Sequence, residues 1–214
     1  MSKKSQEHPY IPALNGEVLR TKHDKNLMLA TEHLMKEHQL ILKYVALLER
    51  YIEFGSKNSE PSLLFEKAPV FIQFIHEFAD KFHHAKEENI LFRYLEQPGV
   101  LTHCNPIPQM LNEHSKAREL VLNMENALLS NDIDKLEVNG IQYARLLKEH
   151  IYKEDNILYP MGERGLSDTA KSSLLKEYTE TDERLDSQSI WCKYEALAAD
   201  LESRLNWLSS AIWL

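Results

Sequence analysis

Hydrophobic residues recur at helical spacing over long stretches of this chain, and short breaks rich in Pro, Gly and Asn separate these stretches. From about residue 26 to residue 54 there is neither Gly nor Pro, so a helix can run without interruption. One apolar face follows this stretch through Leu34, His38, Ile41, Val45, Leu48 and Ile52. The pattern predicts a first helix that ends near Gly55 and Asn58.

A second helix is predicted from about Pro61, a residue type favoured in the first helical turn, to Glu96, just before Pro98-Gly99. Its apolar face consists of Phe71, Phe74, Ile75, Phe78, Phe82, Ile90 and Leu91. An internal proline lacks the backbone N–H that a helix needs, so a bend is expected near Pro69.

The second half of the chain predicts two more helices. The third opens in the Asn-Pro-Ile-Pro segment at residues 105–108 and ends at Asn131-Asp132, where an Asp side chain can cap the following helix. The fourth runs from about Ile133 to Pro160, and residues 161–165 are predicted to form a loop.

The C-terminal segment is too apolar to be disordered. Ser167 or Asp168 is expected to cap it, and it is rich in Leu, Trp and Tyr up to Trp213-Leu214. It is predicted to form one long helix or two short ones, packed on the rest of the domain or on another subunit.

Four long helices joined by short loops predict an all-α fold, an up-down-up-down four-helix bundle. We expect an N-terminal arm at residues 1–25, the bundle at residues 26–165 and a C-terminal helical extension at residues 166–214. In this topology the second and fourth helices run parallel, so side chains from both can stand at the same depth.

A ten-residue repeat lies on these two parallel helices. Residues 83–92 read HHAKEENILF and residues 150–159 read HIYKEDNILY, which share the pattern His-x-x-Lys-Glu-acid-Asn-Ile-Leu-aromatic. A helix places positions i and i+4 on one face, so each copy presents an imidazole beside a carboxylate. Other His-x-x-x-Glu pairs occur, but only the His83/Glu87 register superposes on His150/Glu154.

The first and third helices also share a short motif, Glu37-His38 and Glu113-His114. Each half of the chain therefore offers one histidine followed by a His-x-x-x-Glu pair. A nest of imidazoles and carboxylates suits iron or another first-row metal rather than magnesium or calcium.

Composition limits the partners and the cellular compartment expected for this protein. The formal net charge of −8 and the pI near 5.7 argue against nucleic acid as a partner, which needs a basic face. No apolar run approaches the roughly 20 residues that cross a bilayer, and Lys3-Lys4 is not followed by the apolar segment of a secretory signal, so no membrane association is expected. Two cysteines without a CxxC motif fit a reducing cytoplasm.

The ordered pattern of these motifs resembles the hemerythrin-like family, also called the HHE cation-binding domain, over roughly residues 26–161. The resemblance implies a four-helix bundle that holds two non-haem iron ions, bridged by carboxylates and an oxo or hydroxo group. The implied terminal imidazole ligands are His38, His83, His114 and His150, and the implied bridging carboxylates are Glu87 and Glu154. Asp155 is the alternative to Glu154, because oxygen-carrying hemerythrins use an Asp one position further along.

One feature departs from the oxygen carriers, which place a His-x-x-x-His on the third helix. Here the positions four before and four after the third-helix histidine hold Met110 and Arg118, which argues against reversible dioxygen carriage. His76 and Tyr143 occupy equivalent positions in the repeat, two turns before each motif histidine. We hypothesise that one of them is an extra ligand or a gate to the site.

Other polar residues near the motifs are expected to play supporting roles. His84 and Glu88 lie about 100° around the helix from the inward face, at the surface or behind the ligands. Glu37 and Glu113 are expected to orient neighbouring side chains. His33 is predicted to be peripheral.

These residues and the resemblance together predict a cytoplasmic protein that binds or senses a small oxidant: dioxygen, nitric oxide or peroxide. Two other classes stay open, a di-iron oxidoreductase of peroxidase, catalase or nitric-oxide-reducing type, and a module that stores or donates iron. A homodimer through the extension is a further expectation. For a sensor, we hypothesise that the ligand state of the irons shifts the packing of residues 166–214.

Overall fold

The computed structural model describes residues 30–58 and 60–211, so the predicted N-terminal arm and Trp213 lie outside the described residues. These residues form helices and no strand. Four long helices make the bundle. The first is α1 (Glu32–Asn58), and the second consists of α2 (Pro61–Phe74), η2 (Ile75–His84), η3 (Glu87–Leu91) and α3 (Phe92–Leu95). The third is α4 (Ile107–Leu129), and the fourth consists of α5 (Ile133–Lys153), η4 (Glu154–Leu158) and α6 (Tyr159–Gly165). The all-α bundle prediction is confirmed.

Two further helices, α7 (Asp168–Leu185) and α8 (Ser187–Ala211), follow the bundle. They are separated at Asp186, whose backbone is in the left-handed region with φ of 51°. The Ser167 hydroxyl caps α7 by accepting a hydrogen bond from the Ala170 N–H, and Asp132 caps α5 in the same way. These contacts confirm both predicted caps. Of the two alternatives for the extension, one long helix or two short ones, the break at Asp186 shows that there are two helices.

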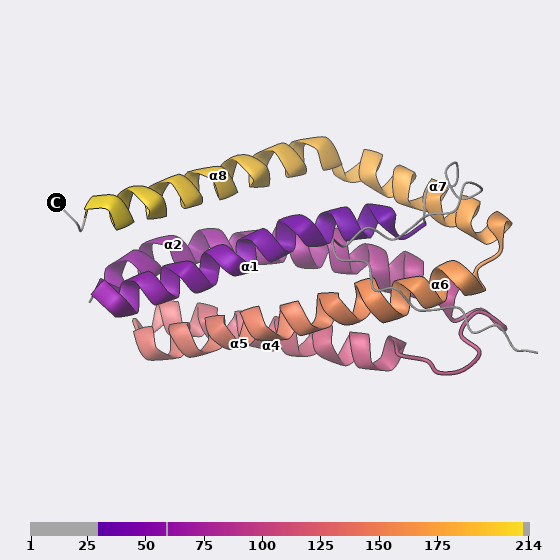
Figure 1. The fold of residues 1–214 in the computed structure, drawn as a ribbon, viewed down its shortest axis with the longest axis horizontal. Coiled ribbons are helices and arrows are strands. Elements are labelled where there is room, and N and C mark those ends of the chain that lie inside the picture. The colour runs from indigo at the N-terminus through magenta and orange to yellow at the C-terminus, as the bar shows by residue number, and fades with distance from the viewer. Residues whose placement is uncertain (1–29, 59, 212–214) are drawn as a thin grey trace, which may run out of the picture.

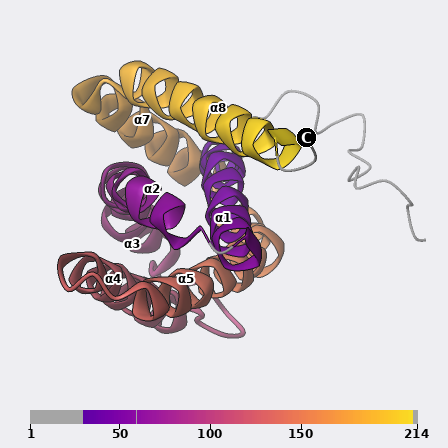
Figure 2. The ribbon, with the colours of Figure 1, turned by 90° about the vertical axis from the view of Figure 1, so that its left-hand side faces the viewer.

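The helices form three layers, with α7 and α8 over α1 and the second long helix, and α4 and α5 below (Figures 1 and 2). The α8 layer shares a continuous apolar core with α1 and α2. Tyr44 and Tyr51 of α1 donate hydrogen bonds to the backbone carbonyls of Tyr194 and Leu201, at 2.8 and 2.9 Å. The extension therefore packs on the bundle of its own chain.

One predicted loop is helical. Residues 161–165 belong to α6, and Pro160 does not end the fourth long helix. Pro160 lies in the first turn of α6, where a proline is tolerated because the missing N–H is not required there.

Segments of π-helix occupy the middle of both repeat-bearing helices. The π-helical segments η2, η3 and η4 cover most of the repeated residues. At the end of η2 the Ala85 N–H reaches the Asp80 carbonyl, five residues back. A π-helix is wider than an α-helix, so each residue turns the chain by less than the roughly 100° of an α-helix. This widening decides which side chains face the bundle interior.

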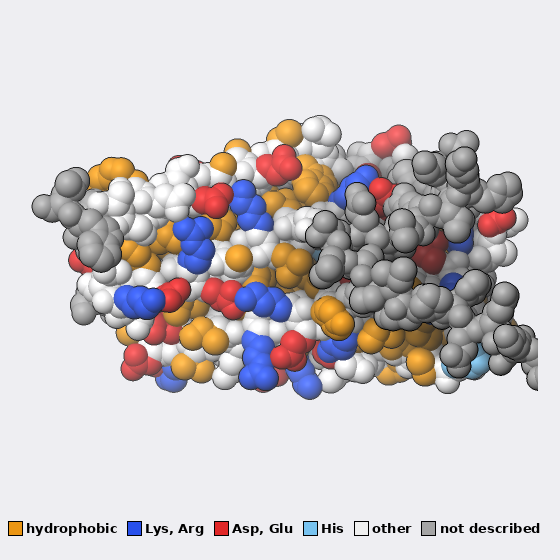
Figure 3. Space-filling view, in the orientation of Figure 1, with side chains coloured by type: hydrophobic (Ala, Val, Ile, Leu, Met, Phe, Trp, Pro, Cys, Tyr) orange, Lys and Arg blue, Asp and Glu red, His pale blue; other side chains and the backbone are white. Residues whose placement is uncertain are grey.

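Acidic and basic side chains are interspersed over the coloured part of the face in Figure 3. The Lys148–Glu49 pair, for example, joins α5 to α1. None of the helices in the described part of the chain is long and apolar enough to span a bilayer.

Candidate metal centre

The six side chains of the predicted metal site meet in the interior of the bundle, each 2% exposed or less. They are His38, His83, Glu87, His114, His150 and Glu154. Their ligand atoms, together with one from His84, form two overlapping groups in which all atoms lie within 4.8 Å of one another. The first group is His38, His83, Glu87 and Glu154, and the second is His84, Glu87, His114 and His150. Glu87 belongs to both groups.

Each of four histidines is held by a carboxylate behind it. The Nδ1 atoms of His83 and His150 lie 2.8 and 2.9 Å from Glu37 and Glu113. The remaining two bonds join His38 to Asp155 and His114 to Glu88, both at 2.7 Å. An ionised carboxylate only accepts hydrogen bonds, so Nδ1 donates and Nε2 is directed to the interior, as metal-binding histidines require.

The two lysines of the repeat complete this support. Lys86 donates to Glu37, and Lys153 donates to Glu113. The repeated pattern thus gains a structural meaning at its histidine, lysine and two acidic positions. Its histidine and glutamate face the centre, its lysine holds the carboxylate that orients that histidine, and its second acid orients a histidine of another helix. The expectation that Glu37 and Glu113 orient their neighbours is confirmed.

The donor atoms are arranged to surround cations. The Nε2 atoms of His38 and His83 are 2.9 Å apart, and those of His114 and His150 are 3.0 Å apart. Glu154 approaches His38 at 3.3 Å and His150 at 3.2 Å, so it lies between the two groups. One carboxylate oxygen of Glu87 and both of Glu154 are buried without a hydrogen-bond partner. Buried lone pairs this close are unfavourable unless a positive charge lies among them, so the residues fit a pair of metal ions.

Protons supply that charge in the metal-free protein. Burial alone would lower the pKa of His38, but its hydrogen bond to Asp155 and the nearby negative charge of Glu154 raise it to about 10. Burial also lowers the pKa of His150, but the nearby carboxylates of Glu154 and Glu113 outweigh burial and raise this pKa to about 10. Burial and the neighbouring charge of Glu154 raise the pKa of Glu87. Metal ions that bind here would replace these protons.

A comparison with protein-family models decides the family. The model described as hemerythrin HHE cation binding domain matches residues 29–162, well over half of the chain. The chain belongs to this family. The match and the buried His/Glu groups together identify a metal-binding HHE domain.

The names of the curated proteins that this chain is similar to state no activity. The uncharacterized protein Rv1995 of Mycobacterium tuberculosis is 30% identical over 141 residues, which cover 61% of this chain and 52% of the relative. The uncharacterized protein UU032 of Ureaplasma parvum is 35% identical over 77 residues, which cover 34% of this chain and 43% of the relative. The chain spans about half the length of the curated relatives it matches.

His84 does not lie at the surface. It is 3% exposed, its ring stacks on that of His114 at 3.9 Å, and it belongs to the second ligand group. The prediction assumed α-helical geometry, whereas His84 ends the π-helical segment η2. The smaller rotation per residue keeps both His83 and His84 directed inward. This imidazole is available at the half of the site where the third helix lacks its second histidine.

The residues suggested as substitutes lie elsewhere. His76 is partly exposed and pairs with Glu125 at 2.8 Å, and Tyr143 packs in the apolar core beside Tyr44 and Phe74. His76 belongs to neither ligand group, and the recorded surroundings of Tyr143 are apolar, so the structure places neither as an extra ligand. The alternative, that one of them is a gate to the site, stays a prediction. Asp155 contacts Nδ1 of His38 rather than the interior, which leaves Glu154 as the central carboxylate.

Tyr159 is a site residue that the sequence reasoning missed. Its hydroxyl donates to Oε1 of Glu87 at 2.5 Å, and its ring stacks on His38 with centroids 5.5 Å apart. The repeat contains a signal for it. The final aromatic position is Phe92 in one copy and Tyr159 in the other, and only the tyrosine brings a proton donor to the centre.

The placement of His84 predicts a selective loss of metal. Replacing His84 with alanine is expected to weaken binding of one of two metal ions by at least the roughly 10- to 100-fold that loss of an outer partner costs, since a whole imidazole is removed from one group only. The matched variant His76→Ala should bind metal like the parent, because His76 lies outside both groups. Titration with a chromophoric chelator measures both affinities, and equal losses in the two variants would contradict the assignment.

Proposed function

We propose that this chain is a non-haem di-iron HHE protein that binds or senses a small oxidant: dioxygen, nitric oxide or peroxide. The observation that supports it most is the pair of ligand groups that share Glu87 and are both approached by Glu154. His38 and His83 would hold one iron. His84, His114 and His150 would hold the other, and the two glutamates would bridge them.

The charges and donor types favour iron. Mixed imidazole and carboxylate ligands suit first-row transition metals. Two ferrous ions carry four positive charges, and two carboxylates with a bridging hydroxide would cancel most of this charge in a buried site. When bound, the iron pair supplies reversible redox chemistry and open coordination positions for a small molecule.

The protein's own residues prepare the site for such a molecule. The carboxylates behind the histidines fix the ring orientations, and buried Phe92, whose ring stacks on that of His114 with centroids 6.0 Å apart, keeps water from this imidazole. Tyr159 holds a proton on its hydroxyl next to Glu87. This proton donor favours a second candidate function, an oxidoreductase that turns over peroxide or nitric oxide.

Iron content and turnover test these alternatives together. Protein loaded anaerobically with ferrous iron and then exposed to air should hold about two irons per chain and develop a near-ultraviolet oxo-to-iron band. Binding without turnover of peroxide or nitric oxide supports the sensing role, and turnover supports the oxidoreductase. Transfer of chelator-labile iron to an acceptor would support storage or donation. Protein that keeps its helical fold but binds little iron would overturn the proposal.

The proposed setting is a reducing cytoplasm, which the two exposed free thiols of Cys104 and Cys192 support. Nucleic acid is not a proposed partner. A homodimer through the extension is proposed on the exposed Trp207 of α8, which is 67% exposed.

A further inference from the structure

The two halves of the metal centre are supported unequally. Glu37, which orients His83, has a side chain 0% exposed, and its partner Lys86 is 1% exposed. The equivalent pair in the other half, Glu113 and Lys153, is 9% and 25% exposed. The repeat makes the two lysines equivalent and the shared Glu-His motif makes the two glutamates equivalent, so the difference must come from residues outside both motifs.

A carboxylate of the extension accounts for this difference. Asp182 of α7 lies 3.1 Å from Nζ of Lys86 and 2.7 Å from Nε2 of His33. His33 in turn lies 3.2 Å from Glu37. A continuous chain of contacts thus runs from α7 through Lys86 and His33 to Glu37, and from there to Nδ1 of His83.

The other half offers a built-in comparison. Gln109 stands four residues before Glu113, as His33 stands four residues before Glu37, and its amide donates to Glu113 at 3.0 Å. Within residues 30–58 and 60–211, no side chain of α7 or α8 bonds to Glu113 or Lys153. Only the His83 half is tied to the extension.

We propose that Asp182 is a positioning residue for the metal bound by His38 and His83. It fixes Lys86 and His33, which fix Glu37 and so the ring of His83. Asp182 lies outside the family-matched residues 29–162, and its effect makes the two metal positions unequal. This inference rests on the proposed di-iron function.

A third metal ion is a competing explanation for this cluster, because ligand atoms of His33, Glu37 and Asp182 also lie within 4.8 Å of one another. The Lys86 ammonium lies among the three. It donates to Glu37 and Asp182 and is 3.4 Å from Nε2 of His33. The cluster already contains its cation, so its role is to hold Lys86.

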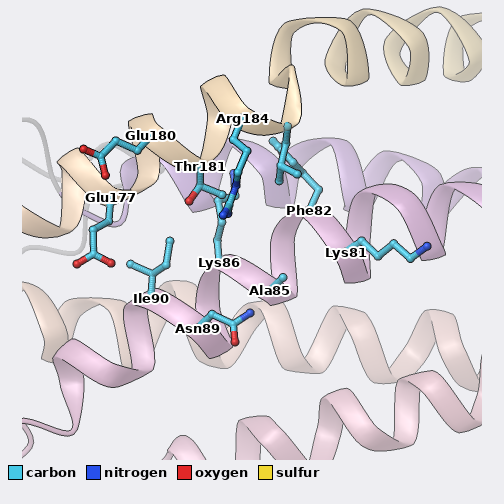
Figure 4. A pocket seen from close by; sticks show the side chains of 11 residues that line it. Lys81, Phe82, Ala85, Lys86, Asn89, Ile90, Glu177, Glu180, Thr181 and Arg184 are labelled. Atoms are coloured by element: carbon cyan, nitrogen blue, oxygen red, sulfur yellow. The ribbon is translucent and has the colours of Figure 1, made fainter.

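The contacts of Asp182 with Lys86 and His33 can be removed without disturbing the apolar packing of α7. Lys86 reaches from the second long helix toward α7, where Thr181 and Arg184 lie beside it (Figure 4). These residues line an open pocket of about 500 Å³ between the two helices. Buried Leu174 and Tyr178 pack α7 in an apolar cluster, and the Tyr178 ring also stacks on that of His33, with centroids 6.1 Å apart, a contact that does not use the Asp182 carboxylate. A variant at Asp182 is therefore expected to keep the helix in place.

The test compares Asp182→Asn with Glu183→Gln, an exposed carboxylate on the same helix, in the full chain loaded with ⁵⁷Fe. Mössbauer spectra should show two iron environments in the parent and in Glu183→Gln. Asp182→Asn should change one environment only and make one iron about threefold to tenfold easier to remove with a chelator. This effect is smaller than the 10- to 100-fold typical of groups that touch a ligand, because Asp182 acts one contact further away.

His33→Gln gives a second, independent variant. It copies the Gln109 arrangement, so Glu37 keeps a donor while the bond from His33 to Asp182 is lost. A change in the same iron environment is expected, and this variant decides the question if Asp182→Asn does not fold. Spectra and chelator rates equal to those of Glu183→Gln, or equal changes in both irons, would overturn the inference. A parent that binds no iron would instead refute the proposed function.

Discussion

Replacing Glu87 with glutamine should remove both metal ions rather than one. Glu87 is fully buried and is the residue that belongs to both ligand groups. A neutral amide cannot bridge two cations with two negatively charged oxygens. Loss of an outer partner of a ligand already lowers metal affinity by about 10- to 100-fold, so loss of this bridge should lower it by at least about 100-fold at both positions.

The metal-free fold should survive this change. Burial and Glu154 raise the pKa of Glu87, which favours the neutral acid in the metal-free protein, and glutamine resembles that form in shape and charge. The carbonyl oxygen of glutamine can still accept the Tyr159 hydrogen bond. Metal content after desalting measures the effect, with Glu96→Gln, at the exposed position just after the same long helix, as control. One metal ion retained at parental affinity by Glu87→Gln would contradict the shared-bridge assignment.

Stripping the metal should lower the thermal midpoint of the protein by about 10 °C. A ligand present at about 1,000 times its dissociation constant stabilises the folded state by roughly 4 kcal/mol. Each kcal/mol shifts the midpoint of a chain of this size by about 2–4 °C. The direction follows from the site, since removal of the ions leaves buried imidazoles and carboxylates that must be neutralised by protons instead.

Differential scanning calorimetry of iron-loaded and chelator-treated protein measures this shift. The far-ultraviolet circular dichroism of the two samples should agree, because the apolar core does not depend on the ions. Glu87→Gln serves as the control, since its midpoint should not respond to the chelator. Equal midpoints for loaded and stripped parent protein would show that metal binding is not linked to folding.

Much of the architecture is predictable because its signals are local. Helical periodicity and the caps at Asp132 and Ser167 depend on neighbouring residues, and the structure reproduces them. Periodicity alone does not identify the candidate ligands, because several His-x-x-x-Glu pairs occur. The repeat identifies them, because only one of these registers is found in both copies. The structure brings all of these candidates together, and their role as iron ligands remains a proposal.

The errors arise where local rules assume ideal geometry. His84 was expected at the surface or behind the ligands because an α-helix turns about 100° per residue, whereas the chain is π-helical there and His84 joins a ligand group. The fourth helix was expected to end at Pro160 and residues 161–165 to form a loop, but Pro160 falls in a permissive first turn and the helix continues. Asp182 had no sequence signal at all. Its partners lie on helices far away in the chain, and only the packing of α7 brings them together.

The position of α8 bears on where the domain can be cut for study. The family match ends at residue 162, but the apolar core continues into α8 through Tyr194, Ala198, Leu201 and Leu205. A fragment trimmed to the match would expose that core. It would also leave the hydroxyls of Tyr44 and Tyr51 without the carbonyls that accept their hydrogen bonds, at about 1–3 kcal/mol each if they stay buried. Recombinant work on the metal site should therefore retain the chain through at least residue 211, because the shorter piece is an incomplete hydrophobic unit prone to aggregation.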